Sequence, residues 1–399
     1  MSRISVLPPL SLYVHFPWCV RKCPYCDFNS YTLQGELEER RYVGALQKDL
    51  EAQAMQVPGR EVISVFFGGG TPSLFSPDAI GRVMESVRRH FAVAADLEVT
   101  MEANPGAIEH GRFGEYRAAG LTRVSLGAQS FDERRLELLG RIHSPDETRR
   151  AAAELHAAGL DNFNLDLMYA LPGQDVGTAL RDVEEALALE PAHISHYQLT
   201  IEHGTVFAAQ PPPLPNDDVA ADMLAECAGR LSAAGYAHYE VSAYAKRDRR
   251  CRHNLNYWTF GDYLGVGAGA HGKLTTSTAI FRTQQLREPR RYLASVPGGV
   301  TRTEVVSEQL PFEFMLNALR LVEGFDISLF PARTGLDWEV VAAAVNRLAA
   351  RGLLMRQEAR LKPSPVGLQF LNDVLLSFVT DQRRQSAKMT GAFGLSTTS

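Results

Sequence analysis

Apolar stretches rich in β-branched and aromatic residues alternate with longer stretches of helical period from residue 12 to about residue 245. The stretches that predict strands are SLYVHF, EVISVFF, LEVTME, LTRVSLG, NFNLDLMY and HISHYQLTI. Helices are predicted between them, for example over residues 76–91, which begin with a Ser-Pro pair, and over residues 144–160, where Gly159 is a natural stop. These repeated units predict an α/β fold whose parallel strands are joined by right-handed crossovers.

Glycine and polar residues collect directly after the predicted strands. The sequences concerned are Gly68-Gly69-Gly70-Thr71-Pro72, Glu102-Ala103-Asn104-Pro105, Gln129-Ser130, and Asp166 followed by Leu171-Pro172-Gly173. In a β/α barrel the carboxyl ends of the strands form one face, where loops assemble a ligand site. Any one of these sequences could be only a turn, but four in the same position predict a shared cleft.

The composition changes after about residue 300. Residues 310–330 and 337–378 predict helices with one short polar hairpin, an arrangement similar to a winged-helix module. Such modules often bind nucleic acid, but here the acidic balance favours packing against the barrel or a partner. The predicted domains are residues 1–245 for the barrel, 246–300 for a linking segment, 301–380 for a helical C-terminal domain and 381–399 for a disordered tail.

Composition and charge narrow the function classes. The 399 residues are 45% hydrophobic, which suits one large domain and a smaller one. The net charge of -5 gives no electrostatic reason to expect nucleic acid as the main partner. The first residues lack the apolar core of a signal peptide, and no apolar run approaches the roughly 20 residues that span a bilayer, so the cytoplasm is the expected compartment.

Three of the five cysteines, Cys19, Cys23 and Cys26, lie close together after the first predicted strand. This clustering does not suit a disulfide framework, and thiolates are soft ligands for zinc or iron–sulfur centres. Structural zinc requires a fourth ligand, and the nearest candidate, His15, lies within the predicted strand. Three ligands leave one metal position vacant, which is typical of a centre that does chemistry. Cys227 lies in a helical pattern and is expected to be a buried apolar residue.

The spacing and the loop of the cysteines resemble the radical S-adenosylmethionine superfamily. In that superfamily three cysteines hold a [4Fe-4S] cluster, and S-adenosylmethionine chelates the fourth iron. The resemblance therefore implies a TIM-like partial (β/α)6 barrel that binds both cofactors. It leaves open whether S-adenosylmethionine is cleaved.

Within the superfamily the chain resembles the oxygen-independent coproporphyrinogen oxidase group. The resemblance runs in order from about residue 11 to residue 205 through LYVHFPWC, FFGGGTPS, MEANP, SLGAQS, LLGRIH and NLDLMYALPG. It implies that Tyr13 lies beside the cluster and that a set of residues contacts S-adenosylmethionine. The members of this set are Gly70, Thr71, Glu102, Gln129, Arg141 and Asp166. Their chemistry suits these roles, because carboxylates accept from hydroxyls or an ammonium and arginine pairs with carboxylates.

Two features of the oxidase itself are absent from this chain. The oxidase has a further cysteine two residues after the third, where this sequence has Phe28. It also has a substantial amino-terminal segment, whereas 18 residues precede Cys19 here. Both differences argue against porphyrinogen decarboxylation.

Residues 251–258, CRHNLNYW, contain the HNxxYW pattern of the HemW haem-chaperone family, and GVGAGAHG at residues 265–272 also resembles that family. The resemblance implies a haem site at His253, Tyr257 and Trp258. A neutral imidazole can ligate haem iron, and the two aromatic rings offer flat apolar surfaces with polar tips. The residues alone favour a different interpretation of His253, a hydrogen-bonded structural histidine on a loop, and it is the family resemblance that favours the haem contact.

Two hypotheses result. In the first, the chain is a haem chaperone that passes haem to an acceptor protein, which the sequence does not identify and which could be membrane-associated; the oligomeric state is open. In the second, it is an oxygen-independent coproporphyrinogen III oxidase, in which a radical derived from S-adenosylmethionine abstracts hydrogen from a propionate side chain and carbon dioxide is lost.

Overall fold

The computed structural model describes residues 4, 6–106 and 111–379. At its centre is a twelve-stranded sheet in the order β14-β13-β12-β11-β1-β4-β5-β6-β7-β8-β10-β9. The six strands predicted from the sequence form its parallel middle. They are β1 (Leu10–Phe16), β4 (Glu61–Gly69), β5 (Ala92–Ala103), β6 (Arg123–Gln129), β7 (Phe163–Tyr169) and β8 (His193–Gln198). The predicted α/β fold with a partial six-stranded barrel is confirmed.

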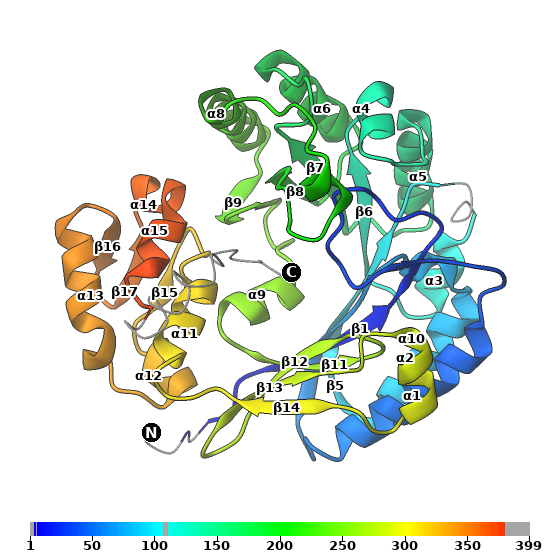
Figure 1. Ribbon diagram of the computed structural model, residues 1–399, viewed down its shortest axis with the longest axis horizontal. Helices are drawn as coiled ribbons and strands as arrows, with labels where there is room; N and C mark the ends of the chain where they lie inside the picture. The colour runs from blue at the N-terminus through cyan, green and yellow to red at the C-terminus, as the bar shows by residue number, and fades with distance from the viewer. Residues whose placement is uncertain (1–3, 5, 107–110, 380–399) are drawn as a thin grey trace.

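Helices cover the outside of the curved sheet (Figure 1). They are α1 (Glu39–Ala54), α2 (Pro77–His90), α3 (Phe113–Ala118), α4 (Glu133–Leu138), α5 (Pro145–Ala157), α6 (Val176–Ala188) and α8 (Asp217–Ala233). The short helix α7 (Val206–Ala209) instead lies against the loop of residues 19–26, where the amide of Phe207 donates to the carbonyl of Pro24 at 3.0 Å, and a 3-10 turn η1 (Pro72–Leu74) follows β4. The Ser-Pro starts behave as predicted, because the side chains of Ser76 and Ser144 cap α2 and α5. Gly159, at a φ of 70°, follows the end of α5.

Side chains along β1 alternate between two faces of the sheet: one packs into the apolar core, and the other faces the inside of the partial barrel. Leu12, Val14 and Phe16 are fully buried in the apolar core cluster of the barrel. Tyr13 and His15, at the alternate positions, line a cavity on the opposite face. The period of two in SLYVHF thus directs polar side chains to the inside of the partial barrel.

The sheet extends beyond the predicted strands at both edges. Next to β1 lie β11 (Asp262–Val266), which is parallel to it, and the antiparallel strands β12 (His271–Thr275), β13 (Ile280–Gln284) and β14 (Thr301–Glu304). The opposite edge carries β9 (Ala237–Glu240) and β10 (Ala243–Ala245). These strands are short and several glycines interrupt them, so their periodicity did not reveal them.

Two helices belong to the same region, α9 (Arg252–Trp258) and α10 (Pro289–Ser295). The HNxxYW pattern lies on α9 and not on a loop, which corrects the placement of His253 in the structural alternative. The helix forms because the carboxylate of Glu98 accepts from the amide groups of Arg252 and His253, both at 3.1 Å.

The C-terminal part has its own apolar core, which includes Phe314, Phe330, Leu348 and Leu361. Its elements are α11 (Leu310–Ala318), β15 (Phe325–Asp326), α12 (Leu329–Thr334), α13 (Glu339–Ala350), β16 (Leu354–Gln357), β17 (Arg360–Pro363), α14 (Pro365–Gln369) and α15 (Leu371–Leu376). Three helices followed by the β16–β17 hairpin match the predicted winged-helix-like arrangement.

The predicted domain boundaries stay predictions, and the predicted tail of residues 381–399 lies outside the described residues. Within the part that is described, no helix combines the length and the apolar character needed to cross a bilayer.

Candidate functional site

The three clustered cysteines lie on a loop after β1. Cys19 ends the short strand β2 (Trp18–Cys19), which pairs with β3 (Tyr31–Thr32), and the amide of Cys26 donates to the carbonyl of Cys23 at 3.1 Å. All five cysteines of the chain are free thiols, and the three on the loop are half-buried. Cys227 is fully buried in the barrel core, as predicted.

The donors on this loop suit an iron–sulfur cluster. In residues 4, 6–106 and 111–379, no three His, Cys, Asp or Glu side chains are grouped as a single metal ion would require. Burial raises the pKa of the Cys19 and Cys26 thiols, so a bound cation is needed to hold them as thiolates. A set of three thiols without a fourth ligand fits an iron–sulfur centre better than structural zinc.

A hydrogen-bonded chain connects the cysteine loop to two of the predicted motifs. Arg141 places Nη1 3.9 Å from the Cys23 sulfur and donates from Nη2 to the Asn104 side chain at 2.6 Å. Asn104 donates in turn to the hydroxyl of Thr71 at 3.1 Å. The structure thus brings together Cys23, Thr71 and Arg141, which are far apart in sequence. Asn104 was not singled out as a site residue, although its position in MEANP was the available signal.

Gly70 is required by the contact between β4 and the cysteine loop. Its amide donates to the carbonyl of Phe16 at 2.6 Å, and the amide of Thr71 donates to the carbonyl of Trp18 at 2.8 Å. A Cβ atom at Gly70 would lie 2.5 Å from the Trp18 oxygen, which is a clash with backbone. The glycine turn therefore holds the cysteine loop in place, and a contact of Gly70 with a cofactor stays a prediction.

Glu102 and Asp166 form a pair of buried carboxylates without a cation at hydrogen-bonding distance among the described residues. The amide of Gly69 donates to Glu102 at 3.0 Å, while Ser125 and Asn164 donate to Asp166 at 3.2 and 2.8 Å. Burial and the neighbouring Asp166 raise the pKa of Glu102 to about 8. Keeping two neighbouring carboxylates away from water costs free energy. A ligand that brings an ammonium or hydroxyl donors would offset that cost, so the pair fits the polar groups of S-adenosylmethionine.

Two further predicted residues lie near the same motifs. Gln129 adopts a φ of 66° and accepts a hydrogen bond from the hydroxyl of Tyr197 at 2.8 Å. The hydroxyl of Tyr13 lies 3.2 Å from Nδ1 of His15, and its ring centre lies 6.2 Å from that of Phe66. Tyr13 therefore has the cofactor motifs of β4 and β5 on one side and the added strands that begin with β11 on the other.

A cavity of about 380 Å³ connects these motifs with the HNxxYW helix. Tyr13, Gly69 and Glu102 line it on the side of the cofactor motifs, and Tyr257 and Trp258 line it from α9. Gly269 and His271 of GVGAGAHG line it too, as does Phe28. The lining residues that the sequence did not single out are Asp27, Asn29, Phe260, Gly261, Tyr263, Lys273, Arg282, Gln284, Arg287 and Asn317. A larger cavity of about 650 Å³ near Ile4 and Arg60 contains none of the predicted site residues.

His253 lies behind the cavity wall. Its Nδ1 is 3.0 Å from the hydroxyl of Ser64, its Nε2 is 2.9 Å from the hydroxyl of Tyr257, and its ring stacks on Phe66 at 4.9 Å. Burial, with a smaller effect of Arg123, lowers the pKa of His253 to about 3, so the imidazole is neutral. Of the three predicted haem contacts, Tyr257 and Trp258 line the cavity, whereas His253 lies behind Tyr257 and Tyr13 and is not part of the lining.

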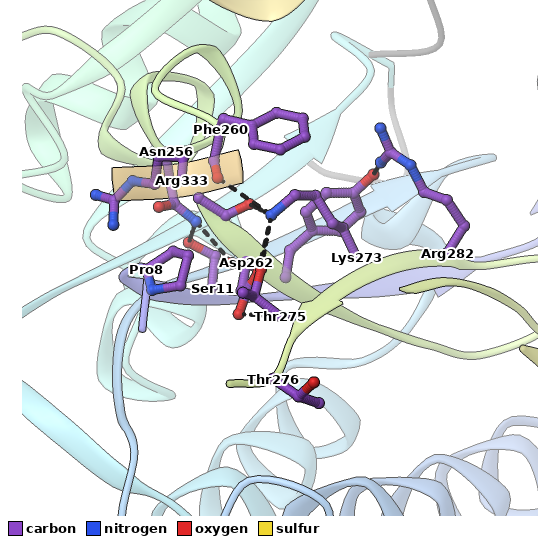
Figure 2. Close-up of polar contacts among 12 residues, drawn as sticks. Pro8, Ser11, Asn256, Phe260, Asp262, Lys273, Thr275, Thr276, Arg282 and Arg333 are labelled. Carbon is purple, nitrogen blue, oxygen red and sulfur yellow. Dashed lines mark hydrogen bonds and ion pairs between the residues drawn. The ribbon is translucent and has the colours of Figure 1, made fainter. Parts of the chain in front are cut away.

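A buried ion pair supports the wall beside α9 (Figure 2). The ammonium of Lys273 donates to Asp262 at 2.9 Å and to the carbonyls of Phe260 and Gly261 at 3.1 and 3.2 Å. Asp262 also accepts from Arg60 at 2.8 Å. Burial lowers the pKa of Lys273 to about 8, so the ammonium is charged at neutral pH. The pair therefore fixes the chain between α9 and β12.

Comparisons with known proteins agree with this geometry. The family model described as "Radical SAM superfamily" matches residues 13–203, and the one described as "HemN C-terminal domain" matches residues 306–370. A solved structure of coproporphyrinogen III oxidase, HemN, from Escherichia coli superposes with a TM-score of 0.78 over 94% of this chain and 91% of that chain. At 24% sequence identity this likeness shows the fold alone.

Closer sequence relatives share nearly the whole length. A protein from Escherichia coli, "Heme chaperone HemW", is 47% identical over 94% of this chain and 99% of its own. The protein of the same name from Haemophilus influenzae is 42% identical with the same coverage. The mitochondrial "Radical S-adenosyl methionine domain-containing protein 1" from Bos taurus is 37% identical over 93% of this chain and 87% of its own.

Proposed function

This chain belongs to the HemW family of haem chaperones, and on that premise we propose that it binds haem in the cavity between α9 and β11–β13 and passes it to an acceptor protein. The observation that carries the proposal is the position of the HNxxYW helix. Tyr257 and Trp258 present their rings to a cavity, where a flat macrocycle can pack against them. In a helix with only a structural role, two adjacent aromatic side chains would pack into the core and would not line a cavity.

His253 is the group in this site that suits the iron. Its imidazole is neutral and therefore has a lone pair available to a metal once the hydrogen bond to Tyr257 is given up. Rotation of one phenol ring would open the way from the cavity to Nε2. The resting bond between the two residues then acts as a cover that haem displaces.

The cofactor half of the cavity is proposed to hold a [4Fe-4S] cluster and S-adenosylmethionine. Cys19, Cys23 and Cys26 would bind the cluster, and the residues that would contact S-adenosylmethionine are Tyr13, Gly70, Thr71, Glu102, Gln129, Arg141 and Asp166. When both are bound, the chemistry they would supply is one-electron reductive cleavage of the sulfonium, with the electron coming from an external reductant. The chain's own contribution is to hold Arg141 between Cys23 and Asn104 and to keep Glu102 ready for a donor group.

Oxygen-independent coproporphyrinogen III oxidase is the second candidate, and it has less support. The oxidase structure shares the fold with this chain, but its low sequence identity does not extend to activity. Phe28 occupies the position of the oxidase's further cysteine and lines the cavity with an apolar ring. A thiol is thus missing from this position of the cavity.

The test is a haem titration of the anaerobically reconstituted protein, followed by the Soret band. We expect saturation near one haem per chain, and an altered spectrum or weaker binding in His253→Ala. His203→Ala, which changes an exposed histidine outside the cavity, is the matched control and should behave like the wild type. Absence of saturable binding in the wild type would exclude the proposal, and the assay would then turn to decarboxylation of coproporphyrinogen III.

A further inference from the structure

The wall of the cavity opposite the cofactor motifs carries two arginines outside the family motifs, Arg282 and Arg287, beside His271, the histidine of GVGAGAHG. We propose that Arg287, His271 and Arg282 form a carboxylate-binding site in this wall and that its ligand is the pair of propionate groups of a tetrapyrrole. This inference rests on the proposed function and adds to it the contact that orients the cargo.

The pairing of β12 with β13 brings these side chains to one face. His271 lies opposite Gln284 and Lys273 lies opposite Arg282 in the antiparallel ladder. Directly opposed residues and residues two apart on one strand point to the same side of a sheet. All four line the cavity, as does Arg287, three residues after the end of β13. The wall is thus a short two-stranded surface that faces the aromatic rings of α9.

The cations on this wall differ in how many donors they have free. Lys273 uses its ammonium for Asp262 and two backbone carbonyls, and Figure 2 shows its amine directed into this network and away from the guanidinium of Arg282. Arg282 donates to Glu313 and to the Tyr263 hydroxyl. Lys273 therefore supports the wall, and Arg282 contributes mainly positive charge.

Arg287 and His271 are the free donors. The only hydrogen bond of the exposed Arg287 side chain is a long one, 3.4 Å, from Nε to Asn29, so within the described part of the chain its two terminal nitrogens are unpaired. The ring of the exposed His271 has no hydrogen-bond partner among the same residues. Two parallel N–H groups of a guanidinium match the two oxygens of a carboxylate.

The charge around these donors favours an anion. After burial, the positive charges of Arg282 and Arg287 are the causes that lower the pKa of His271, so all three groups lie within electrostatic reach of one another. The acidic residues of the cavity lining are Asp27 and Glu102, and neither forms an ion pair with Arg287 or His271 in the described structure. Glu313 pairs with Arg282 and Asp262 pairs with Lys273, so the unpaired positive charge on the wall is that of Arg287.

The rest of the lining indicates which anion fits. Tyr13, Phe28, Tyr257 and Trp258 add aromatic surface to the same cavity. A ligand that is flat, apolar and carries carboxylates at one edge satisfies both surfaces, and haem with its two propionates has this form. The carboxylate of S-adenosylmethionine is the other source of the same chemistry, and the experiment separates the two.

The experiment compares haem with its dimethyl ester, in which both propionates are uncharged, on the full-length reconstituted chain. We expect the wild type to bind haem more tightly than the ester and Arg287→Gln to lose about ten- to a hundredfold in haem affinity with its ester affinity unchanged. Arg290→Gln, an exposed arginine outside the cavity lining, is the matched control and should equal the wild type. His271→Gln should show a smaller loss of the same kind.

The outcomes are distinct. Equal losses for haem and ester, or no loss in Arg287→Gln, would overturn the carboxylate site while the proposed function stands. A loss in S-adenosylmethionine binding without a loss in haem binding would assign the wall to the cofactor and also overturn it. No saturable haem binding by the wild type would remove the proposed function and the inference together. Urea unfolding of each variant confirms that the fold is retained.

Discussion

The hydroxyl of Tyr257 lies 2.9 Å from Nε2 of His253, and the Ser64 hydroxyl lies 3.0 Å from Nδ1 of the same ring, so both nitrogens of the imidazole are engaged. A histidine that ligates haem iron needs one nitrogen free. If His253 is the haem ligand as proposed, its Nε2 becomes available once the hydrogen bond to Tyr257 is given up.

Tyr257→Phe tests this relationship. Removing the hydroxyl frees Nε2, and because a neutral hydrogen bond contributes about 1 kcal/mol, haem affinity should rise by roughly fivefold. The gain and the imidazole-type spectrum should vanish in the double variant with His253→Ala. Tyr236→Phe removes a hydroxyl that donates to the carbonyl of Pro191 outside the cavity lining and serves as the control. Identical spectra for the single and double variants would show that His253 does not bind the iron.

Glu102 predicts a pH dependence of cofactor binding. Its pKa of about 8 means that a proton occupies the carboxylate over much of the neutral range. A cation or hydroxyl donor prefers the ionised form, so affinity for S-adenosylmethionine should fall by about tenfold or more from pH 8.5 to 6.5. Equilibrium dialysis measures the affinity for S-adenosylmethionine of the wild type and of Glu102→Gln. Titration of the cofactor itself affects both affinities equally, so it cancels in their ratio. A ratio that is independent of pH would contradict the assignment.

Cys23→Ala should abolish the visible absorption of an iron–sulfur cluster after anaerobic reconstitution, because only two of the three thiolates would remain. Cys227→Ala is a suitable control, since that thiol is fully buried in the barrel core. Iron and sulfide analysis accompanies the spectrum. Retention of the absorption by Cys23→Ala would exclude this loop as the cluster site.

The Lys273–Asp262 pair predicts unequal costs for its two partners. Asp262→Ala leaves the buried ammonium with backbone carbonyls and a hydroxyl alone, and should destabilise the fold by about 3–5 kcal/mol. Lys273→Met should cost less, because Arg60 still neutralises Asp262 at 2.8 Å. Asp96→Ala breaks an exposed ion pair with Arg252 and should leave stability unchanged. Urea unfolding ranks the three, and the reverse order for Asp262 and Lys273 would refute the argument.

The barrel could be predicted because its strands are continuous apolar runs separated by capped helices. Tyr13 shows where the strand pattern stops: only the family resemblance singled it out, and the structure shows that it lines the cavity on the interior face. The cysteine loop was equally predictable, since three thiols at short spacing have few structural uses. The order of residues within each segment was therefore sufficient to predict the barrel strands and the cysteine loop.

The wall of β12 and β13 could not be predicted in the same way. HGKLT and IFRTQ show no regular alternation, are only five residues long and follow a glycine-rich segment that resembles a loop. The face shared by His271 and Arg282 exists only once the two strands pair and β11 joins β1. The role of Tyr257 as a cover for His253 likewise depends on a short helix that Glu98, from a distant strand, anchors.

Strand β1 lies between β4, which leads into the glycine turn, and β11, which leads to the positively charged wall. Tyr13 on this strand lines the cavity that both ligands would enter. If each ligand orders this shared strand, their binding free energies are linked, and thermodynamics requires the linkage to be reciprocal. Whatever factor S-adenosylmethionine applies to haem affinity, haem must apply to the affinity for S-adenosylmethionine. The chain would then sense its own loading without a separate regulatory site.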